Sequence, residues 1–282
     1  SLLTFVPFSL MALPRISSER QIALVIVLQT LAANLGSMCT PVGNPQNLYL
    51  YFYYGMDLGT FLSLLLPYTL VSLALLALSV FLLPGTPIPV SARLAARRTR
   101  NLPVLAPPRQ LWLLGGMFSL SLLTVAHVLD YRLTLAIVAA VTALTRPRYF
   151  RYADYRLLGT FVAFFVLIGN MSQLTAFREI LTGYLAGHEF LIALLASQII
   201  SNVPAAVLLS GFTDQGAALL LGTDIGGLGT LVASMASLIS YGMFVRACPR
   251  QQGWYLKLFT LLNLAYLLVL VLFAWLYDPY LY

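Results

Sequence analysis

Polar and small side chains recur in two apolar segments of the chain, residues 34–48 and 224–238, which align without a gap at an offset of 190 residues. Glycines, threonines and side chains with amide or hydroxyl groups coincide in the two copies. The aligned pairs are Asn34 with Asp224, Gly36 with Gly226, Thr40 with Thr230, Asn44 with Ser234, Asn47 with Ser237, and Leu48 with Leu238. Similarity at a fixed offset indicates an internal repeat.

Glycine and proline in these segments predict breaks in membrane helices. The first copy contains Pro41, Gly43 and Pro45, and the second contains Gly227. Such residues interrupt the backbone hydrogen-bond ladder. Free carbonyl groups and nearby side-chain oxygens can then coordinate a sodium-sized cation, while helix N-termini beside a break attract an anion. The side chains concerned are those of Ser37, Thr40, Asn44, Asn47, Thr230 and Ser234. The alternative, close helix packing by small residues, is less favoured for a duplicated cluster.

A second polar motif, SQIISNVPAA at residues 197–206, precedes the second copy. Ser201 and Asn202 offer a hydroxyl and an amide, and Val203 and Pro204 follow them. Proline suits the first turn of a helix because its missing N–H costs nothing there. We predict that this motif forms the tip of a helical hairpin; a polar kink that stabilises helix contacts is the alternative.

Asp224 is the one acid placed well inside an apolar run. A carboxylate at the bilayer midplane costs about 2.5 to 3.5 kcal/mol on insertion scales, and such residues usually serve ion or proton transfer. We therefore interpret Asp224 as a cation ligand or a proton carrier. A position near the outer interface would instead make it a plain helix cap.

The solvent of this chain is lipid, because 60% of its 282 residues are hydrophobic and 9% are charged. Uncharged stretches are long enough to cross ~30 Å of hydrocarbon, and we expect about eight membrane segments, re-entrant ones included. Cys39, Cys248, His127 and His188 are isolated and show no metal-ligand spacing, and the sequence carries no motif of an enzyme active site. The sequence therefore indicates neither an enzyme nor a bound cofactor.

The net charge of +7 reflects the sidedness of membrane loops rather than nucleic-acid binding. Counting crossings from a cytoplasmic loop at residues 84–110 leaves only Arg132 and Arg178, of the 16 Lys and Arg residues, on the outer side. The basic residues that follow residues 190–212 lie on the cytoplasmic side only if this segment enters and leaves the membrane on the outer side. The two copies of the repeat then cross in opposite directions, and a substrate site is expected between them.

These features predict an all-α integral membrane protein with inverted-topology repeats, a re-entrant hairpin and discontinuous helices. The incomplete first repeat covers residues 1–84, with a hairpin arm, an unwound helix and a membrane helix, and a cytoplasmic loop covers residues 85–109. The second repeat covers residues 110–282, with scaffold helices, the hairpin at 190–212, an unwound helix at 215–244 and a final membrane helix at 257–277.

Residues 34–48, 197–206 and 223–238 resemble signature segments of the ion transporter superfamily. This group contains citrate and dicarboxylate/sodium symporters, arsenite permeases and one class of sodium/proton antiporters. The pairing of NPQN with SNVPAA carries the resemblance, which covers nearly all of the chain. It implies two re-entrant hairpins, a homodimer and elevator-like movement of a transport domain in a bacterial cytoplasmic membrane.

The resemblance also implies that sodium is a coupling ion, held at Ser201, Asn202 and Thr230. The full predicted site for substrate and ions comprises Asn34, Gly36, Ser37, Thr40, Pro41, Gly43, Asn44, Pro45, Asn47, Ser201, Asn202, Val203, Pro204, Asp224, Gly226, Gly227, Thr230, Ser234 and Ser237.

The first repeat departs from the superfamily pattern, because the Asn-containing turn expected before its unwound helix is missing. Residues 1–10 match only the second arm of a hairpin. Comparison with the second repeat places about 80 further residues before this point. We therefore expect an N-terminally truncated member of the superfamily.

The leading hypothesis is uptake of a small anion, such as a di- or tricarboxylate, coupled to sodium or protons across the lipid bilayer. No Arg or Lys is expected at the midplane, so bound cations would offset the substrate charge. Sodium/proton antiport through Asp224, an arsenite or oxyanion permease, and an inactive membrane subunit are the alternatives.

Overall fold

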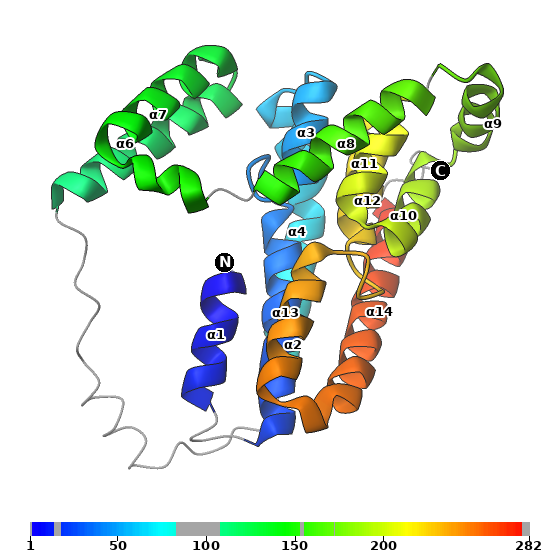
Figure 1. Cartoon of the computed structure of the whole chain (residues 1–282). Coiled ribbons are helices and arrows are strands. Elements are labelled where there is room, and N and C mark those ends of the chain that lie inside the picture. The colour runs from blue at the N-terminus through cyan, green and yellow to red at the C-terminus, as the bar shows by residue number, and fades with distance from the viewer. Residues whose placement is uncertain (1, 14–17, 83–107, 153–154, 172, 278–282) are drawn as a thin grey trace. The chain divides into compact units, whose positions relative to one another are not determined.

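The computed structural model describes residues 2–13, 18–82, 108–152, 155–171 and 173–277 (Figure 1). These residues form helices and turns without any strand, which confirms the all-α prediction. The chain divides into two compact units, one of Ser1–Pro89 with Phe164–Tyr282 and one of Val90–Ala163. The predicted cytoplasmic loop at 85–109 lies almost entirely outside the described residues.

The first unit, here called the helix bundle, contains most of the helices. Its elements are α1 Leu2–Ala12, α2 Glu19–Ser37, α3 Pro45–Tyr53, α4 Leu58–Phe81, α9 Thr175–Leu185, α10 Glu189–Ile200, α11 Asn202–Ser210, α12 Gly216–Gly226, α13 Met235–Ala247, the short η3 Pro249–Gln251 and α14 Gln252–Tyr277. Helix α8, Tyr155–Met171, runs across the boundary between the units. Helix α2 lies at the centre of the bundle and packs on α1, α4, α13 and α14.

The second unit is a helical hairpin of α6 Pro108–Val125 and α7 Tyr131–Thr145, followed by the 3-10 helix η2 Pro147–Tyr152. The hydroxyl groups of Thr124 and Thr134 form a hydrogen bond between its two helices. Arg146 donates to Gln110 Oε1 over 2.8 Å, which joins the start of α6 to the end of α7.

Two helices of the bundle are interrupted at the repeated segments. Helix α2 ends at Ser37 and α3 begins at Pro45, while α12 ends at Gly226 and α13 begins at Met235. The aligned residues Asn44 and Ser234 are the N-caps of α3 and α13, and the side chain of each accepts a backbone N–H of its helix. The two interruptions therefore fall at equivalent positions of the repeat.

Glycine is required at the first interruption. A Cβ atom added to Gly43 would lie 1.7 Å from the Ser37 carbonyl oxygen, so no other residue fits this backbone path. The chain must fold back closely after α2 before Asn44 can cap α3.

The two interrupted helices run in opposite directions within the bundle. At one end, Tyr54, which follows α3, donates its hydroxyl to the Thr213 carbonyl oxygen just before α12, over 2.8 Å. At the other end, Arg20 at the start of α2 lies over the Trp254 ring at 5.1 Å, close to the end of α13. The start of α2 and the end of α13 therefore lie at the same end of the bundle.

Helices α10 and α11 form a hairpin with Ser201 at its tip. Ser201 has φ 73°, a conformation that is uncommon for residues other than glycine. The Thr213 hydroxyl donates to Glu189 Oε1 over 3.2 Å and joins the two open ends of the hairpin. The Asn202 N–H donates to the Ala233 carbonyl oxygen over 2.9 Å, which anchors the tip in the break between α12 and α13.

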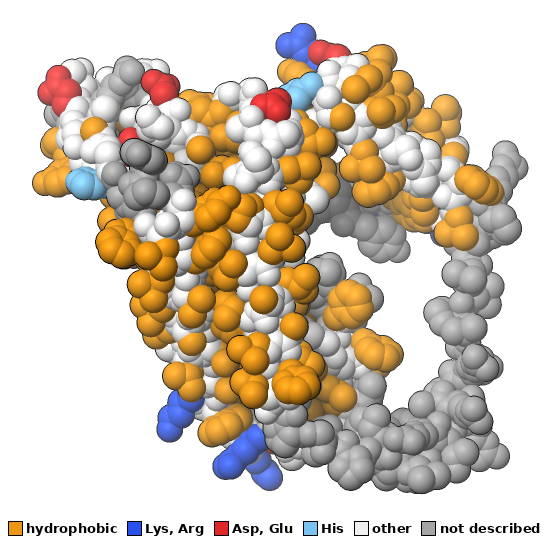
Figure 2. All heavy atoms as spheres, turned by 180° about the vertical axis from the view of Figure 1, so that it is seen from behind, with side chains coloured by type: hydrophobic (Ala, Val, Ile, Leu, Met, Phe, Trp, Pro, Cys, Tyr) orange, Lys and Arg blue, Asp and Glu red, His pale blue; other side chains and the backbone are white. Residues whose placement is uncertain are grey.

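The surface of the bundle has the character of a membrane protein. Large apolar side chains of α4 and α14 are exposed, among them Leu70, Leu73, Leu268 and Leu272. Figure 2 shows this apolar surface, with Lys and Arg side chains at the lower end of the bundle. The basic residues Arg20, Arg246, Arg250 and Lys257 belong to the elements at that end. At the other end, Asp57 and Asp214 lie in turns and Glu189 is the first residue of α10.

By length and composition, two of the described helices can cross a membrane alone, at Leu58–Phe81 and Pro249–Tyr277. Helices α9 and α10 satisfy the same criteria only as a pair bent by 113°. Shorter apolar helices lie at Gln110–Val125, Tyr131–Thr145, Leu158–Leu167 and Gly216–Gly226. The expected number of about eight segments therefore stays a prediction.

Candidate functional site

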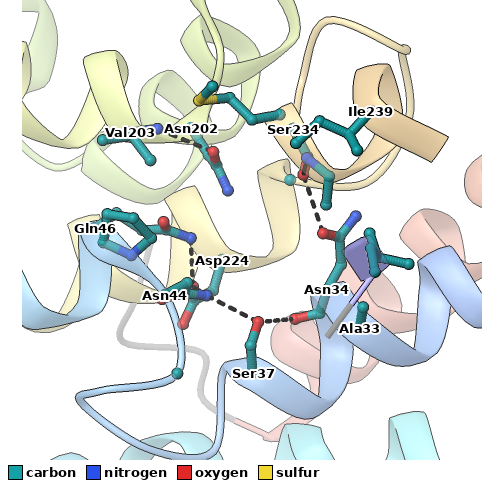
Figure 3. Close-up of a pocket in the computed structure, with 16 residues that line it drawn as sticks. Ala33, Asn34, Ser37, Asn44, Gln46, Asn202, Val203, Asp224, Ser234 and Ile239 are labelled. Carbon is teal, nitrogen blue, oxygen red and sulfur yellow. Dashed lines mark hydrogen bonds between the residues drawn. The ribbon is translucent and has the colours of Figure 1, made fainter. Parts of the chain in front are cut away.

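A cavity of about 470 Å³ lies in the helix bundle where the two interrupted helices meet the hairpin tip (Figure 3). The residues around it are Leu2, Ala33, Asn34, Ser37, Gly43, Asn44, Pro45, Gln46, Asn202, Val203, Asp224, Gly227, Ser234, Met235, Ala236 and Ile239. Asp224 is the one side chain among them that carries a formal charge.

Three helices begin at this cavity. Pro45 and Gln46 open α3, Asn202 and Val203 open α11, and Met235 is the first residue of α13. Helix N-termini carry partial positive charge and N–H groups, so their convergence favours an anion. The Asn202 amide nitrogen also points into the cavity, while its Oδ1 accepts the Val203 N–H over 2.9 Å (Figure 3).

Asp224 projects from the last turn of α12 into the same space. Its Oδ1 accepts hydrogen bonds from Asn44 Nδ2 at 3.3 Å and from Gln46 Nε2 at 3.1 Å. The side chain is 6% exposed. A carboxylate near a helix C-terminus is not favoured by the helix dipole, so the plain cap interpretation does not fit this position.

A matching hydrogen bond lies on the other side of the cavity. The Ser234 hydroxyl donates to Asn34 Oδ1 over 2.9 Å. Asn34 aligns with Asp224 and Ser234 aligns with Asn44, so each helix cap of one copy contacts the polar residue of the other copy. The two aligned segments thus exchange hydrogen-bond partners across the cavity.

Four buried polar atoms of these segments have no hydrogen-bond partner among the described residues. They are Asn34 Nδ2, Asn47 Oδ1, Asp224 Oδ2 and Ser237 Oγ. These atoms belong to two aligned pairs, Asn34 with Asp224 and Asn47 with Ser237. Buried polar groups are normally paired, so these atoms are candidates for contact with water, an ion or a ligand.

Gln198, in the hairpin, forms hydrogen bonds with the backbone of the second interruption. Its Nε2 donates to the carbonyl oxygens of Gly226 and Leu228 at 2.8 and 2.9 Å, and its Oε1 accepts the Thr230 N–H at 2.9 Å. One side chain thus satisfies three backbone groups at the end of α12 and in the interruption that follows it. Gln46 and Gln198 are absent from the predicted site, although both lie inside the motifs that defined it.

The structure brings part of the predicted site together around the cavity. The residues that line it are Asn34, Ser37, Gly43, Asn44, Pro45, Asn202, Val203, Asp224, Gly227 and Ser234. Gly36 and Thr40 line a neighbouring cavity of about 430 Å³, together with Ser37 and Gly43. Pro41, Asn47, Ser201, Pro204, Gly226, Thr230 and Ser237 line neither of these two cavities.

The sodium position implied by resemblance, at Ser201, Asn202 and Thr230, stays a prediction. The Thr230 hydroxyl donates to the Gln198 carbonyl oxygen over 3.0 Å, and the Ser201 hydroxyl donates to the Ala233 carbonyl oxygen over 3.4 Å. Within the part of the chain that the structure describes, no group of three or more His, Cys, Asp or Glu side chains could hold a metal ion.

Apolar helices that surround a polar cavity between interrupted helices are typical of the membrane transporter class. The chain belongs to the citrate transporter (CitMHS) family, which matches residues 3–215. The predicted resemblance to the ion transporter superfamily is thereby confirmed, as is a location in the cell membrane. The chain is a transporter-family protein and not an enzyme, and this family needs no cofactor.

Two curated relatives agree with this assignment. The chain is 30% identical over 241 residues to the inner membrane protein YbiR of Escherichia coli K12, covering 84% of this chain and 62% of the relative. It is 31% identical over 257 residues to the uncharacterized transporter MJ0456 of Methanocaldococcus jannaschii, covering 89% of this chain and 66% of the relative. The chain thus spans a little under two thirds of the length of each relative. No solved structure matches the fold.

Proposed function

We propose that the protein moves a small anion of the di- or tricarboxylate class across the membrane, coupled to sodium ions or protons. The observation that carries this proposal is the convergence of three helix N-termini on a cavity whose one charged lining residue is Asp224. The helix ends and amide groups attract an anion. Asp224 repels it, so a cation at the site is needed to offset the negative charges.

The proposed mechanism is alternating access between inverted repeats. The opposite directions of α2–α3 and α12–α13 support it, as does the exchange of hydrogen-bond partners around the cavity. The distribution of charge supports a cytoplasmic location for the end with Arg20, Arg246 and Lys257. The hairpin of α10 and α11 then enters from the outer side, with its tip at the cavity. A homodimer is part of this proposal through the superfamily resemblance alone.

The test is uptake into proteoliposomes of the protein expressed with any sequence that its gene places before Ser1. Radiolabelled citrate, succinate and arsenite are offered under an inward sodium gradient, an inward proton gradient, or neither. We expect accumulation of a carboxylate only with a cation gradient. Arsenite accumulation alone would replace the carboxylate class by an oxyanion, and equal uptake without any gradient would refute coupling.

Sodium/proton antiport is the second candidate, because Asp224 is a buried acid without a basic partner among the described residues that line the cavity. It predicts sodium efflux that depends on a pH gradient and is indifferent to every anion. Measuring proton movement with a pH-sensitive dye in the same vesicles separates the two functions.

A further inference from the structure

We propose that the arginine-rich end of the second unit binds the phosphate headgroup of an anionic phospholipid. The site, here called the headgroup pocket, has a volume of about 290 Å³ and is lined by Thr145, Arg146, Pro147, Arg148 and Tyr149. It belongs to the second unit, whereas the cavity proposed to hold the transported anion belongs to the helix bundle. The inference is therefore independent of the proposed function.

The first argument is an excess of positive charge in this unit. Residues 90–163 contain ten arginines and two aspartates, without lysine or glutamate. Three of the arginines fall within residues 146–151. Asp130 caps the opposite end of α7, and Asp154 lies outside the described residues. The described residues of the unit therefore offer no carboxylate at the end of α7 where the three arginines lie, and this end attracts an anion.

Hydrogen bonds hold the headgroup pocket in shape. Arg146 donates to Gln110 Oε1 over 2.8 Å, and Gln110 Nε2 donates to the Tyr149 hydroxyl over 3.1 Å. One glutamine at the start of α6 thus positions two side chains that line the pocket. A guanidinium group has five N–H donors in a planar fork, which matches the oxygens of a phosphate group. Arg146 and Arg148 can therefore bind one phosphate group from two directions.

The length of α7 indicates that η2 lies near the membrane surface. Helix α7 is apolar and has 15 residues. At 1.5 Å per residue it is about 22 Å long, which is less than the ~30 Å of the hydrocarbon layer. A bilayer adapts to a short segment by thinning, and the residues at its ends extend toward the headgroups. The arginines of η2 then lie at the level of lipid phosphates rather than in the water beyond them.

The surroundings of the pocket favour a lipid over a free phosphate ion. Leu144 and Trp112 are 85% and 81% exposed, and Tyr149 and Phe150 are exposed as well. Aromatic side chains are typical of the interface between membrane and water, and apolar side chains beside the pocket can contact acyl chains. This end of α7 is also predicted to be cytoplasmic, and anionic phospholipids give the cytoplasmic leaflet its negative surface potential.

The experiment measures quenching of Trp112 fluorescence by phospholipids that carry bromine on their acyl chains. Trp112 follows Gln110 by two residues, so it reports on the pocket end of α6. Trp254 and Trp275 are replaced by phenylalanine, as is any tryptophan that the gene places before Ser1. The purified full chain in neutral detergent is titrated with brominated phosphatidylglycerol or brominated phosphatidylcholine. We expect half-maximal quenching at a mole fraction of phosphatidylglycerol at least tenfold below that of phosphatidylcholine.

The variants change Arg148 and Arg151 together and leave the hydrogen bonds of Arg146 in place. Each arginine near an anionic surface contributes about fivefold in affinity, so glutamine at both positions should reduce the preference for phosphatidylglycerol by roughly tenfold or more. Lysine at both positions keeps the charge and should retain more of the preference than glutamine. Arg132→Gln is the matched control, because Arg132 is an exposed arginine at the other end of the same hairpin, and its preference should equal that of the wild type.

Two further measurements guard against a folding defect and a free anion. Native mass spectrometry of the protein with its three tryptophans intact should detect more phosphatidylglycerol on the wild type than on the double glutamine variant. Inorganic phosphate at the concentration of the lipid should leave the quenching unchanged. Displacement of the lipid by that phosphate would reassign the pocket to a soluble anion and overturn the proposal.

Equal quenching of the wild type by the two lipids would also overturn the proposal. The same holds for an unchanged preference in the double glutamine variant, or for an equal loss in Arg132→Gln, which would indicate general surface charge instead of a pocket. None of these measurements involves transport. Failure of the proposed function would appear separately, as an absence of cation-driven anion uptake in vesicles.

Discussion

Replacing Gly226 with alanine should destabilise the contact between the hairpin and the second interrupted helix. A Cβ at this position would lie 2.9 Å from Leu194 Cα and 2.9 Å from Ser197 Cβ. Ordinary carbon contacts lie at about 3.5 to 4.0 Å, so α10 must move away by roughly 0.6 to 1.1 Å. Rotamer changes cannot relieve the clash, because Leu194 Cα belongs to the backbone.

The magnitude follows from two opposing effects. Overpacking of a buried contact costs about 1 to 3 kcal/mol. Alanine in place of a helical glycine stabilises the folded protein by about 0.5 to 1 kcal/mol. The free energy of unfolding should therefore fall by roughly 0 to 2.5 kcal/mol, which lowers the unfolding midpoint by up to a few degrees.

Gly242→Ala provides the matched control for Gly226→Ala. Gly242 lies within α13, and an added Cβ would meet no atom within 4 Å. This variant should be more stable than the wild type by about 0.5 to 1 kcal/mol, because only the helix propensity changes. Both midpoints are measured in detergent by intrinsic fluorescence at one scan rate. A Gly226→Ala protein as stable as Gly242→Ala would refute the close packing of α10 on α12.

Three further predictions concern the hairpin brace, the membrane topology and an exposed helix cap. Gln198→Leu should lower the free energy of unfolding by about 1 to 3 kcal/mol for each backbone group left buried and unpaired, and the unfolding midpoint should fall with it. Gln215 is exposed, so Gln215→Leu should change the midpoint little. Single cysteines at Arg98 and Arg148, in a cysteine-free background, should react with an impermeant maleimide from the same face of the membrane; labelling from opposite faces would contradict the inverted repeat. Hydrogen bonds from the first turn of α4 hold the pKa of Asp57 below its ordinary value, so the stabilisation it provides should be complete above the ordinary pKa and disappear as the pH falls through the lowered one. Asp57→Asn should therefore be less stable than the wild type at pH 7 and match it in strong acid, and a difference independent of pH would contradict this role.

The sequence by itself determined the class of fold and the positions of the helix interruptions. The excess of apolar residues indicates a membrane protein, and the residue types that start and cap helices indicate where the helices are interrupted. Pro45 is suited to the first position of a helix, and Asn44 and Ser234 are suited to cap one. These effects act over a few residues, so they are readable from spacing alone.

The residues that complete the site were decided by the tertiary structure. Gln46 contacts Asp224 across 178 positions of sequence, and Gln198 contacts the α12 break across about 30 positions. Nothing in the local pattern distinguishes these glutamines from others, because their partners are defined only when α10 packs on α12 and α3 reaches it. The polar atoms that lack partners are likewise a product of packing, since burial and distance determine which groups can be satisfied. The sequence therefore located the polar segments, and long-range packing decided which of their atoms face the cavity.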